Sequence, residues 1–308
     1  MTLQDLLDLA PYSLSDRALF NNDAVRDAII RDPECARGRR YCFHSVYGGP
    51  VHPVLLAVGL GASREVVDLF YDANTMLSGR SSIEGETDGY GRTAIHYACE
   101  FRADEDVVLL LLERDPASAY KRDYMGRTAL HCACAYSSPL GIVQILTEHC
   151  RLAILMEKDR RGRTPLHIAC SHLAGLDVIR LLLEFRPKAV KEKNLKGATP
   201  LEIVEKIADS TIAELTSLSL INQLLDAKED DKLLMIWKEF RSLGWISGAA
   251  LVLEMHPSFI HNLHENDSMK PDLLSKIGQD GNLQTMSLFV RNMTHIFSGI
   301  NAQEHNAP

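Results

Sequence analysis

A four-residue string recurs along this chain at almost constant intervals. Thr-Ala-Ile-His begins at Thr93, Thr-Ala-Leu-His at Thr128, Thr-Pro-Leu-His at Thr164 and Thr-Pro-Leu-Glu at Thr199, so the intervals are 35, 36 and 35 residues. A period of this length makes each unit one supersecondary module that buries its apolar face only by stacking on its neighbours. We therefore expect function to lie in a surface rather than in an enclosed pocket.

The unit that begins at Asp159 shows how the first half of a module is built. Asp159-x-x-Gly162 is a turn signal, because aspartate accepts hydrogen bonds from its own downstream backbone and glycine adopts a positive φ without steric cost. It predicts the tip of a hairpin-like finger. The threonine and proline at 164 and 165 then predict a helix start, in which the hydroxyl caps free N–H groups.

The remainder of the same unit predicts two helices that pack at different depths. Leu166, Ala169 and Cys170 recur at helical spacing and give a first helix with a narrow face of small side chains. The apolar run 178–183 predicts a second, more deeply buried helix, which Pro187 ends. Each module is therefore expected to consist of a finger, a first helix, a loop and a second helix, in that order.

These residues resemble the ankyrin repeat, whose signature is Asp-x-x-Gly-x-Thr-Pro-Leu-His-x-Ala followed by a Val/Ile-Leu-Leu second helix. The match is specific in the units that begin at Asp88, Asp123 and Asp159, whereas the unit from Asn194 has Glu202 in place of the histidine. The period of 35 or 36 residues and the proline after the second helix are similar to divergent ankyrin families expanded in unicellular algae. The resemblance implies an all-α solenoid that binds another protein and is not an enzyme.

A second marker extends the register beyond these units. Leu-Glu-x-x-Pro occurs at 112–116, 183–187 and 253–257, and the prolines are 71 and 70 residues apart, which is two periods each time. We therefore expect about eight units. The expected organisation is degenerate N-terminal repeats in 1–87, well-formed repeats in 88–208, degenerate C-terminal helical repeats in 209–300 and a disordered tail in 301–308.

The C-terminal third is open to a different interpretation. Residues from Asp209 onward could form a separate helical effector domain that the repeats address to a target, and the aromatic residues Trp237, Phe240 and Trp245 suit either arrangement. The preserved Leu-Glu-x-x-Pro at 253–257 favours continuation of the solenoid.

Charge and cysteine content restrict the function classes. A net charge of −8 argues against a general affinity for nucleic acid or anionic membranes. Seven cysteines, of which three recur at one repeat position, indicate packing and reduced thiols rather than a disulfide framework.

Asp5 and Asp8 stand where a targeting segment carries basic residues, and no apolar run approaches bilayer length. We expect a monomer in the cytosol or the nucleus.

Three His-x-x-Cys pairs are the strongest candidates for metal or nucleophilic chemistry, at His96, His131 and His167. Zinc needs several ligands that converge on one point, and a nucleophile needs an oriented base. The histidine and the cysteine of these pairs each recur at a fixed position of the repeat, which a structural role explains. The ankyrin resemblance implies that this histidine bonds backbone groups between neighbouring fingers. Phosphate-binding, dinucleotide and hydrolase motifs are absent from the sequence. We expect no catalytic residue, no metal and no cofactor.

The resemblance implies that finger tips and the outward positions of the first helices line the binding face. Aromatic residues, methionine and arginine are enriched where interfaces concentrate their energy. The alternative is that some of these rings pack on neighbouring repeats. The candidate partner-binding residues are Tyr90, Tyr97, Phe101, Tyr124, Met125, Tyr136, Arg160, Arg161, Ile168 and His172.

The finger segments are basic although the chain is acidic. Segments 121–127, 157–163 and 191–196 each carry a net charge of +2. This predicts attraction of an acidic segment of a partner protein, while the simpler reading is that the charges keep an exposed edge solvated.

Overall fold

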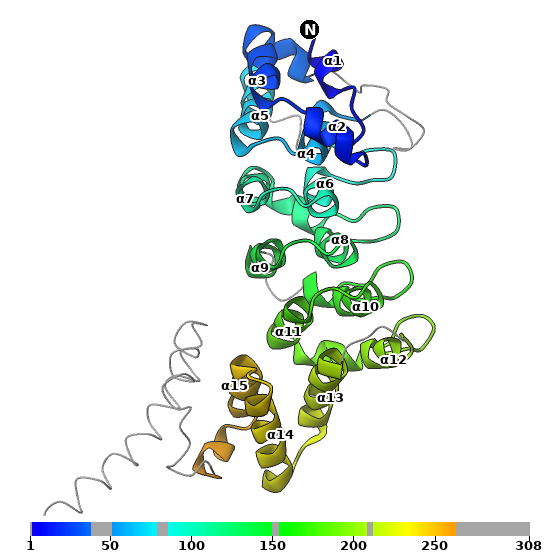
Figure 1. Ribbon diagram of the computed structural model, residues 1–308, viewed down its shortest axis with the longest axis vertical. Coiled ribbons are helices and arrows are strands. Elements are labelled where there is room, and N and C mark those ends of the chain that lie inside the picture. The colour runs from blue at the N-terminus through cyan, green and yellow to red at the C-terminus, as the bar shows by residue number, and fades with distance from the viewer. Residues whose placement is uncertain (1, 38–50, 79–85, 150–153, 208–211, 263–308) are drawn as a thin grey trace, which may run out of the picture. The chain divides into compact units, whose positions relative to one another are not determined.

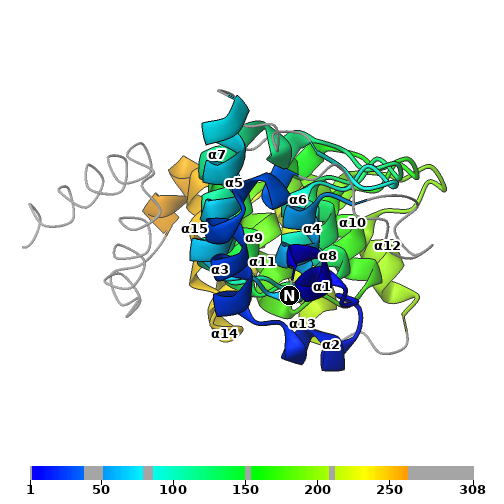
Figure 2. The same ribbon diagram turned by 90° about the horizontal axis from the view of Figure 1, so that it is seen from above.

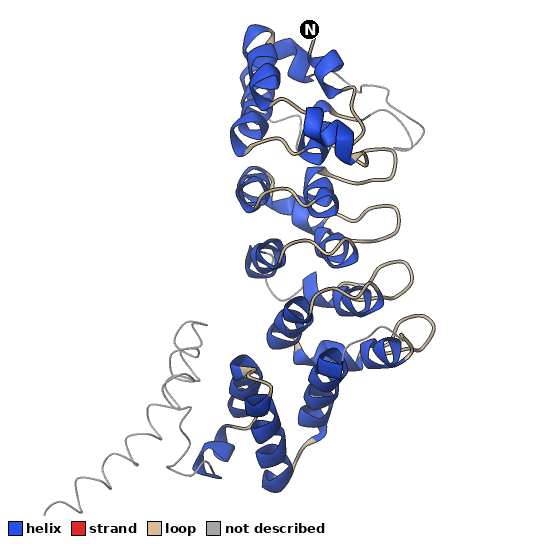
Figure 3. Ribbon diagram, viewed as in Figure 1, coloured by secondary structure: helices blue, strands red, loops and turns tan. Residues whose placement is uncertain are grey.

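The computed structural model describes residues 2–37, 51–78, 86–149, 154–207 and 212–262 (Figure 1). Over these residues the chain is helical, with fifteen α-helices, several short 3-10 helices and no β-strand (Figure 3). It divides into two compact units, residues 1–214 and 215–308. The expected all-α architecture is confirmed.

Pairs of antiparallel helices fill most of the first unit, in which first helices contact first helices and second helices contact second helices (Figure 1). The loops that precede the first helices from α6 onward project from one side of the stack as fingers (Figure 1, Figure 2). The first helices are α4 (Pro53–Leu60), α6 (Ala94–Phe101), α8 (Ala129–Ala135), α10 (Pro165–Ser171) and α12 (Pro200–Glu205). The second helices are α5 (Arg64–Ser78), α7 (Glu105–Arg114), α9 (Leu140–His149) and α11 (Leu176–Phe185).

Small side chains let the first helices approach closely. Cys99, Cys134 and Cys170 are fully buried, and so are the alanines that precede them by one position. This confirms that the repeated cysteine is a packing residue. A close approach of helices buries more apolar surface per turn, which is where a short helix obtains its stability.

Proline ends the second helices, as the Leu-Glu-x-x-Pro pattern predicts. α7 ends at Arg114 and α11 at Phe185, and a 3-10 helix begins at the proline in each case, η3 (Pro116–Tyr120) and η5 (Pro187–Lys191). A proline in the first turn lacks only an N–H that has no partner there. A further 3-10 helix, η4 (Ile154–Met156), follows α9 in the chain.

The N-terminal residues pack on the first pair. α3 (Asn22–Arg31) and η1 (Pro33–Arg37) contact α5, and α1 (Leu3–Leu7) contacts α3 and α4. A short helix, α2 (Leu14–Leu19), lies between α1 and α3 in the chain and has no buried residue. α4 is contacted by α1, η1, α5 and α6. It is therefore buried over its whole length, which fits its continuous apolar sequence.

The second unit has its own aromatic core. It contains most of α13 (Ile212–Asp226), together with α14 (Asp230–Ser242), α15 (Ile246–Met255) and η6 (Pro257–Asn262). The rings of Trp237 and Phe259 lie 6.2 Å apart, and Phe240 meets Trp245 edge to face at 5.1 Å. The predicted tail 301–308 lies outside the described residues, and continuation of the repeat beyond residue 208 stays a prediction.

Candidate binding surface

One carboxylate holds each of the first three fingers in shape. Oδ1 of Asp159 accepts hydrogen bonds from the backbone N–H groups of Arg161 (2.9 Å) and Arg163 (2.8 Å), and Oδ2 accepts from Nε of Arg163 (2.8 Å). The same contacts recur around Asp88 and Asp123. The predicted turn is therefore confirmed, with an added buried ion pair to the residue four positions on.

The fourth finger keeps the turn without the ion pair. Asn194 accepts from the backbone N–H groups of Lys196 (2.8 Å) and Ala198 (3.1 Å). Alanine replaces arginine where asparagine replaces aspartate, so neither a buried carboxylate nor a buried guanidinium lacks its partner. This joint change agrees with the high cost of leaving one member of a buried pair alone.

Backbone hydrogen bonds join each finger to the next in one repeated register. The N–H of Tyr124 donates to the carbonyl of Tyr90 (2.8 Å), that of Arg160 to Met125 (2.9 Å), and that of Leu195 to Arg161 (3.0 Å). Because every finger is bonded to its neighbours, the tips form a preordered row. Preordering reduces the conformational entropy that a binding partner must overcome.

The repeated histidines link each first helix to the following finger. Nδ1 of His131 accepts from the backbone N–H of Thr128 (3.2 Å), so the proton sits on Nε2, which donates to the carbonyl of Arg163 (3.0 Å). His96 and His167 make the same bonds. Burial lowers the pKa of His96 and His131 to about 4 and keeps them neutral. The structural role implied by the ankyrin resemblance is confirmed.

Among the described residues, no group of three or more His, Cys, Asp or Glu side chains is placed so that it could hold a metal ion. Burial raises the pKa of the Cys132 thiol to about 12, which removes the thiolate that a nucleophile or metal ligand requires. The described helices are also too short or too polar to cross a bilayer.

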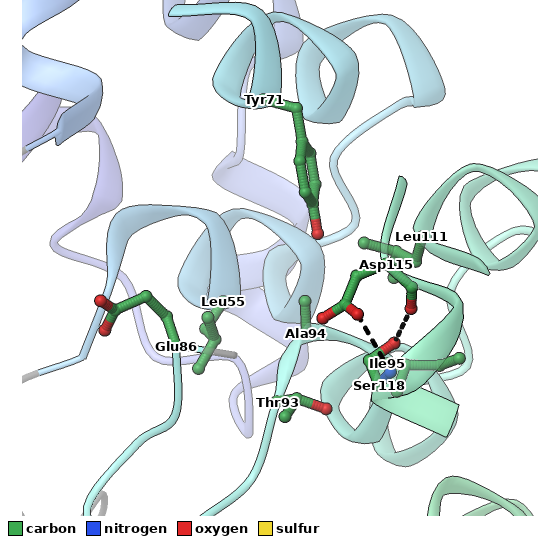
Figure 4. A pocket seen from close by; sticks show the side chains of 9 residues that line it. All are labelled: Leu55, Tyr71, Glu86, Thr93, Ala94, Ile95, Leu111, Asp115 and Ser118. Atoms are coloured by element: carbon green, nitrogen blue, oxygen red, sulfur yellow. Dashed lines mark hydrogen bonds between the residues drawn. The ribbon is translucent and has the colours of Figure 1, made fainter. Parts of the chain in front are cut away.

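A small depression beside η3 offers little to a ligand (Figure 4). Its empty volume of about 240 Å³ includes space open to solvent, and two of its polar residues, Asp115 and Ser118, already bond each other. The Asp115 carboxylate accepts from the backbone N–H of Ser118 (3.2 Å), and the Ser118 hydroxyl donates to the Asp115 carbonyl (2.6 Å). These bonds cap the 3-10 helix, so the depression is a structural feature of the turn.

Exposed apolar and basic side chains occupy the tips of successive fingers. The exposed fractions are 45% for Tyr90, 59% for Tyr124, 43% for Met125 and 78% for Leu195. Tips are surface loops held by a rigid scaffold, which is a common setting for binding residues. We call this set the finger-tip row, and it comprises Tyr90, Tyr124, Met125, Arg160, Arg161, Leu195 and Lys196.

Ion pairs between fingers use part of the predicted positive charge. Arg122 pairs with Glu157, and Lys158 pairs with Glu192 at 2.7 Å, each pair joining one finger to the next. By contrast, the three basic residues of the finger-tip row form no ion pair with any other described residue. The charge available to a partner is therefore concentrated on the third and fourth fingers.

Three predicted binding residues lie in the interior. Tyr97 and Ile168 are fully buried and Phe101 is 5% exposed, so the expectation that their side chains lie on the exposed face beside the finger tips is wrong. Tyr97 and Ile168 follow the histidine by one position, where Cys132 is also buried, because every inner first helix is contacted from both sides by its neighbours. Of the other predicted first-helix residues, Tyr136 is half-buried and His172 is exposed.

Phe101 is covered by a segment far away in the sequence. Its ring meets that of Tyr12 edge to face at 4.8 Å, and Arg17 donates to its carbonyl oxygen (3.0 Å). Tyr12 and Arg17 are contact residues that the repeat pattern missed. They precede the recognisable repeats, so no periodic signal points to them.

Two protein-family models match the chain. One, described as ankyrin repeats in three copies, matches residues 54–156, and the other, described as ankyrin repeat, matches residues 161–194. No match is found among the curated proteins.

Proposed function

Because residues 54–194 make this chain an ankyrin repeat protein, we propose that it is a non-enzymatic protein-binding scaffold whose partner contacts the finger-tip row. Ankyrin repeats generally mediate protein–protein interaction. The observation that carries the proposal is the exposure of large apolar side chains on consecutive tips of a hydrogen-bonded row. Contiguous exposed apolar side chains are informative where scattered ones are not.

The chemistry of the finger-tip row changes along its length. Tyr90, Tyr124 and Met125 on the first two fingers suit an apolar or aromatic segment of the partner, whereas Arg160 and Arg161 on the third suit carboxylates. The partner that fits best is therefore a segment with an apolar half and an acidic half. Opposite charges also accelerate association, so we expect its affinity to fall as salt is added.

A non-enzymatic role agrees with how the reactive side chains are used. The repeated histidines His96, His131 and His167 are bonded on both ring nitrogens, for example His131 to Thr128 and Arg163. A histidine in this state has no free nitrogen for proton transfer to a substrate.

Affinity capture with the tagged full chain tests the proposal. A variant with Tyr90→Ala, Tyr124→Ala and Met125→Ala is compared with the wild type in lysate from the source cell. We expect the variant to lose a partner that the wild type enriches, with an affinity reduced at least about tenfold, because exposed aromatic anchors carry much of an interface's energy.

The matched control variant removes exposed apolar residues elsewhere, through Leu14→Ala, Leu19→Ala and Ile30→Ala, whose exposed fractions are 81%, 70% and 62%. The control should bind like the wild type. Equal capture by all three chains, each folded by circular dichroism, would contradict the assignment of the finger-tip row.

A second candidate function rests on the compactness of residues 215–262. The aromatic core of this unit supports the alternative that the repeats carry a separate helical effector domain. Residues 209–308 expressed alone would then melt cooperatively. A terminal piece of a solenoid would instead be largely unfolded, because it has lost the neighbour on which it stacks.

A further inference from the structure

The N-terminal segment, residues 10–17, lies across the first helices α4 and α6. The Tyr12 hydroxyl donates to Oε1 of Glu100 (2.9 Å) and accepts from Nη1 of Arg92 (2.7 Å), and Arg17 donates to the carbonyl of Phe101 (3.0 Å). These contacts join residues that are eighty or more positions apart in the sequence. They are specific polar contacts rather than general apolar cover.

Comparison with the later repeats shows which surface the segment occupies. Glu100 and Phe101 are buried, whereas the two residues at the same register positions of the next repeat, Ala135 and Tyr136, are half-buried. At the same two positions in the repeat of α10, Ser171 is half-buried and His172 is exposed. The segment therefore covers a face of α6 that is at least partly open to solvent in α8 and α10.

Gly59 makes room for the segment. It stands in α4 at the register position that Glu100 occupies in α6, and a Cβ atom there would lie 3.1 Å from Cβ and Cγ of Pro11 and 3.1 Å from Cδ1 of Tyr97. Such a contact is closer than side chains normally allow, so any larger residue would push Pro11 away. Pro11 sits on α4 and Tyr12 reaches α6, so that the Pro-Tyr pair bridges two repeats.

The polar groups under Tyr12 form a socket found only in the first of the compared fingers. Arg92 binds Asp88 (2.7 Å), as the arginines of the next two fingers bind their aspartates, but it also binds Glu100 (2.6 Å). The side chains of Arg92 and Glu100 are 6% and 3% exposed. A phenol hydroxyl satisfies both, because it accepts from the guanidinium and donates to the carboxylate.

The segment is ordered by its own hydrogen bonds, and of residues 10–17 only Pro11 is buried. Asp16 accepts from the N–H of Ala10 (3.0 Å) and from the hydroxyl of Ser13 (3.0 Å), which folds the segment into a compact turn. Yet α2 buries none of its residues, and Leu14 and Leu19 point their side chains to solvent. Elements with few buried apolar contacts open at low free-energy cost.

We propose that Gly59, Arg92, Glu100 and Phe101 form a second peptide-binding site, which the chain's own residues 10–17 fill as a ligand in cis. The site takes a peptide with a Pro-Tyr pair and an arginine five residues after the tyrosine. The proline seats on Gly59, the tyrosine enters the Arg92–Glu100 socket against the Phe101 ring, and the arginine bonds the Phe101 carbonyl. A partner of this chemistry binds by displacing the segment, and none of its proposed contacts is to a residue of the finger-tip row.

Fluorescence anisotropy with a labelled synthetic peptide of residues 8–20 tests the proposal on full-length chains. The first variant is Tyr12→Ala with Arg17→Ala, and the matched control is Leu14→Ala with Leu19→Ala. Apparent affinity scales with the fraction of molecules whose site is open, so we expect the first variant to bind the peptide at least about tenfold more tightly than wild type or control. A peptide with phenylalanine in place of tyrosine should bind at least about tenfold more weakly, since Arg92 and Glu100 each lose their hydrogen bond to the phenol hydroxyl.

A second variant guards against loss of the fold. Tyr12→Phe keeps the ring on Phe101 and removes only the hydroxyl, and it should bind the labelled peptide several-fold more tightly than the wild type. The proposal is overturned if a folded variant binds the peptide no better than the control, or if the phenylalanine peptide binds equally well. In either case the segment is only a cap on the terminal repeat. The variants leave the finger-tip row unchanged, so this outcome does not depend on the function proposed above.

Discussion

Mild acid should destabilise the repeats because their buried histidines are neutral. Burial lowers the pKa of His52, His96 and His131 to about 4, against 6.5 for an exposed histidine. Between these two values the unfolded chain binds protons that the folded chain does not bind. Stability is therefore complete above pH 6.5, falls as the pH drops toward 4, and loses nothing further from these groups below 4.

The size of the effect follows from the two pKa values. Lowering the pH from 7 to 5 should cost about 2 kcal/mol of unfolding free energy for each such histidine, or about 6 kcal/mol for the three together. That loss is comparable with the total stability of many single domains, which is about 5–15 kcal/mol. Hydrogen bonds from Arg163 lower the pKa of the Asp159 carboxyl below its usual value of 3.8, so this group stays ionised between pH 7 and pH 5.

Urea denaturation followed by circular dichroism at pH 7 and pH 5 measures the effect, and His131→Gln isolates one histidine. Glutamine retains an acceptor for the N–H of Thr128, in the way that Glu202 serves Thr199 in the fourth finger (2.9 Å). The variant should be less stable than wild type at pH 7, because it loses the bond to Arg163. Its further loss on going to pH 5 should be smaller by about 2 kcal/mol.

The exposed histidine provides the control. His172→Gln makes the same side-chain change at an exposed position, where no buried imidazole is removed. If His131→Gln and the wild type lose the same free energy between pH 7 and pH 5, then His131 is not held neutral by burial and the reasoning is refuted.

Three further predictions concern stability and reactivity. Gly162→Ala should destabilise the chain by about 2 kcal/mol more than Gly197→Ala, since both have a positive φ but only at Gly162 would a Cβ approach the next finger's backbone, at 2.8 Å; urea denaturation of both variants checks the difference. Asp159→Ala should cost about 3 kcal/mol in the same assay, because Arg163 and two backbone N–H groups lose their acceptor, and a change below 1 kcal/mol would contradict the role given to the carboxylate. Cys134 should resist alkylation at pH 8 until the chain unfolds, as followed by peptide mass spectrometry, because burial raises its thiol pKa; rapid labelling of the folded chain would argue against that burial.

Local chemistry made much of the fold predictable from the sequence. The turn at Asp159, the helix start at Thr164 and the helix end at Pro187 depend on residues within a few positions of each other, and the structure confirms all three. The role of His131 also followed, because the ankyrin resemblance carries a hydrogen bond that repeats with the period.

The binding residues were less predictable because exposure depends on distant parts of the chain. The side chain that follows the histidine, as at Tyr97, is buried by both neighbouring first helices, which a single unit does not reveal. Phe101 and His172 occupy the same position in their repeats, and His172 is exposed. Phe101 is instead covered by Tyr12, which belongs to no recognisable repeat. The finger tips were easier, because a tight turn leaves its central side chains in solvent whatever lies beyond it.

Site-specific photo-cross-linking tests the central claim most directly. A benzophenone amino acid replaces Tyr124 in the full chain, and a control chain carries it at Ile30, which is exposed to a similar extent but lies on α3. After irradiation in lysate from the source cell, we expect a discrete protein adduct at position 124 and none at position 30. No adduct at position 124, or the same adducts at both positions, would contradict the claim that the finger-tip row binds a protein partner.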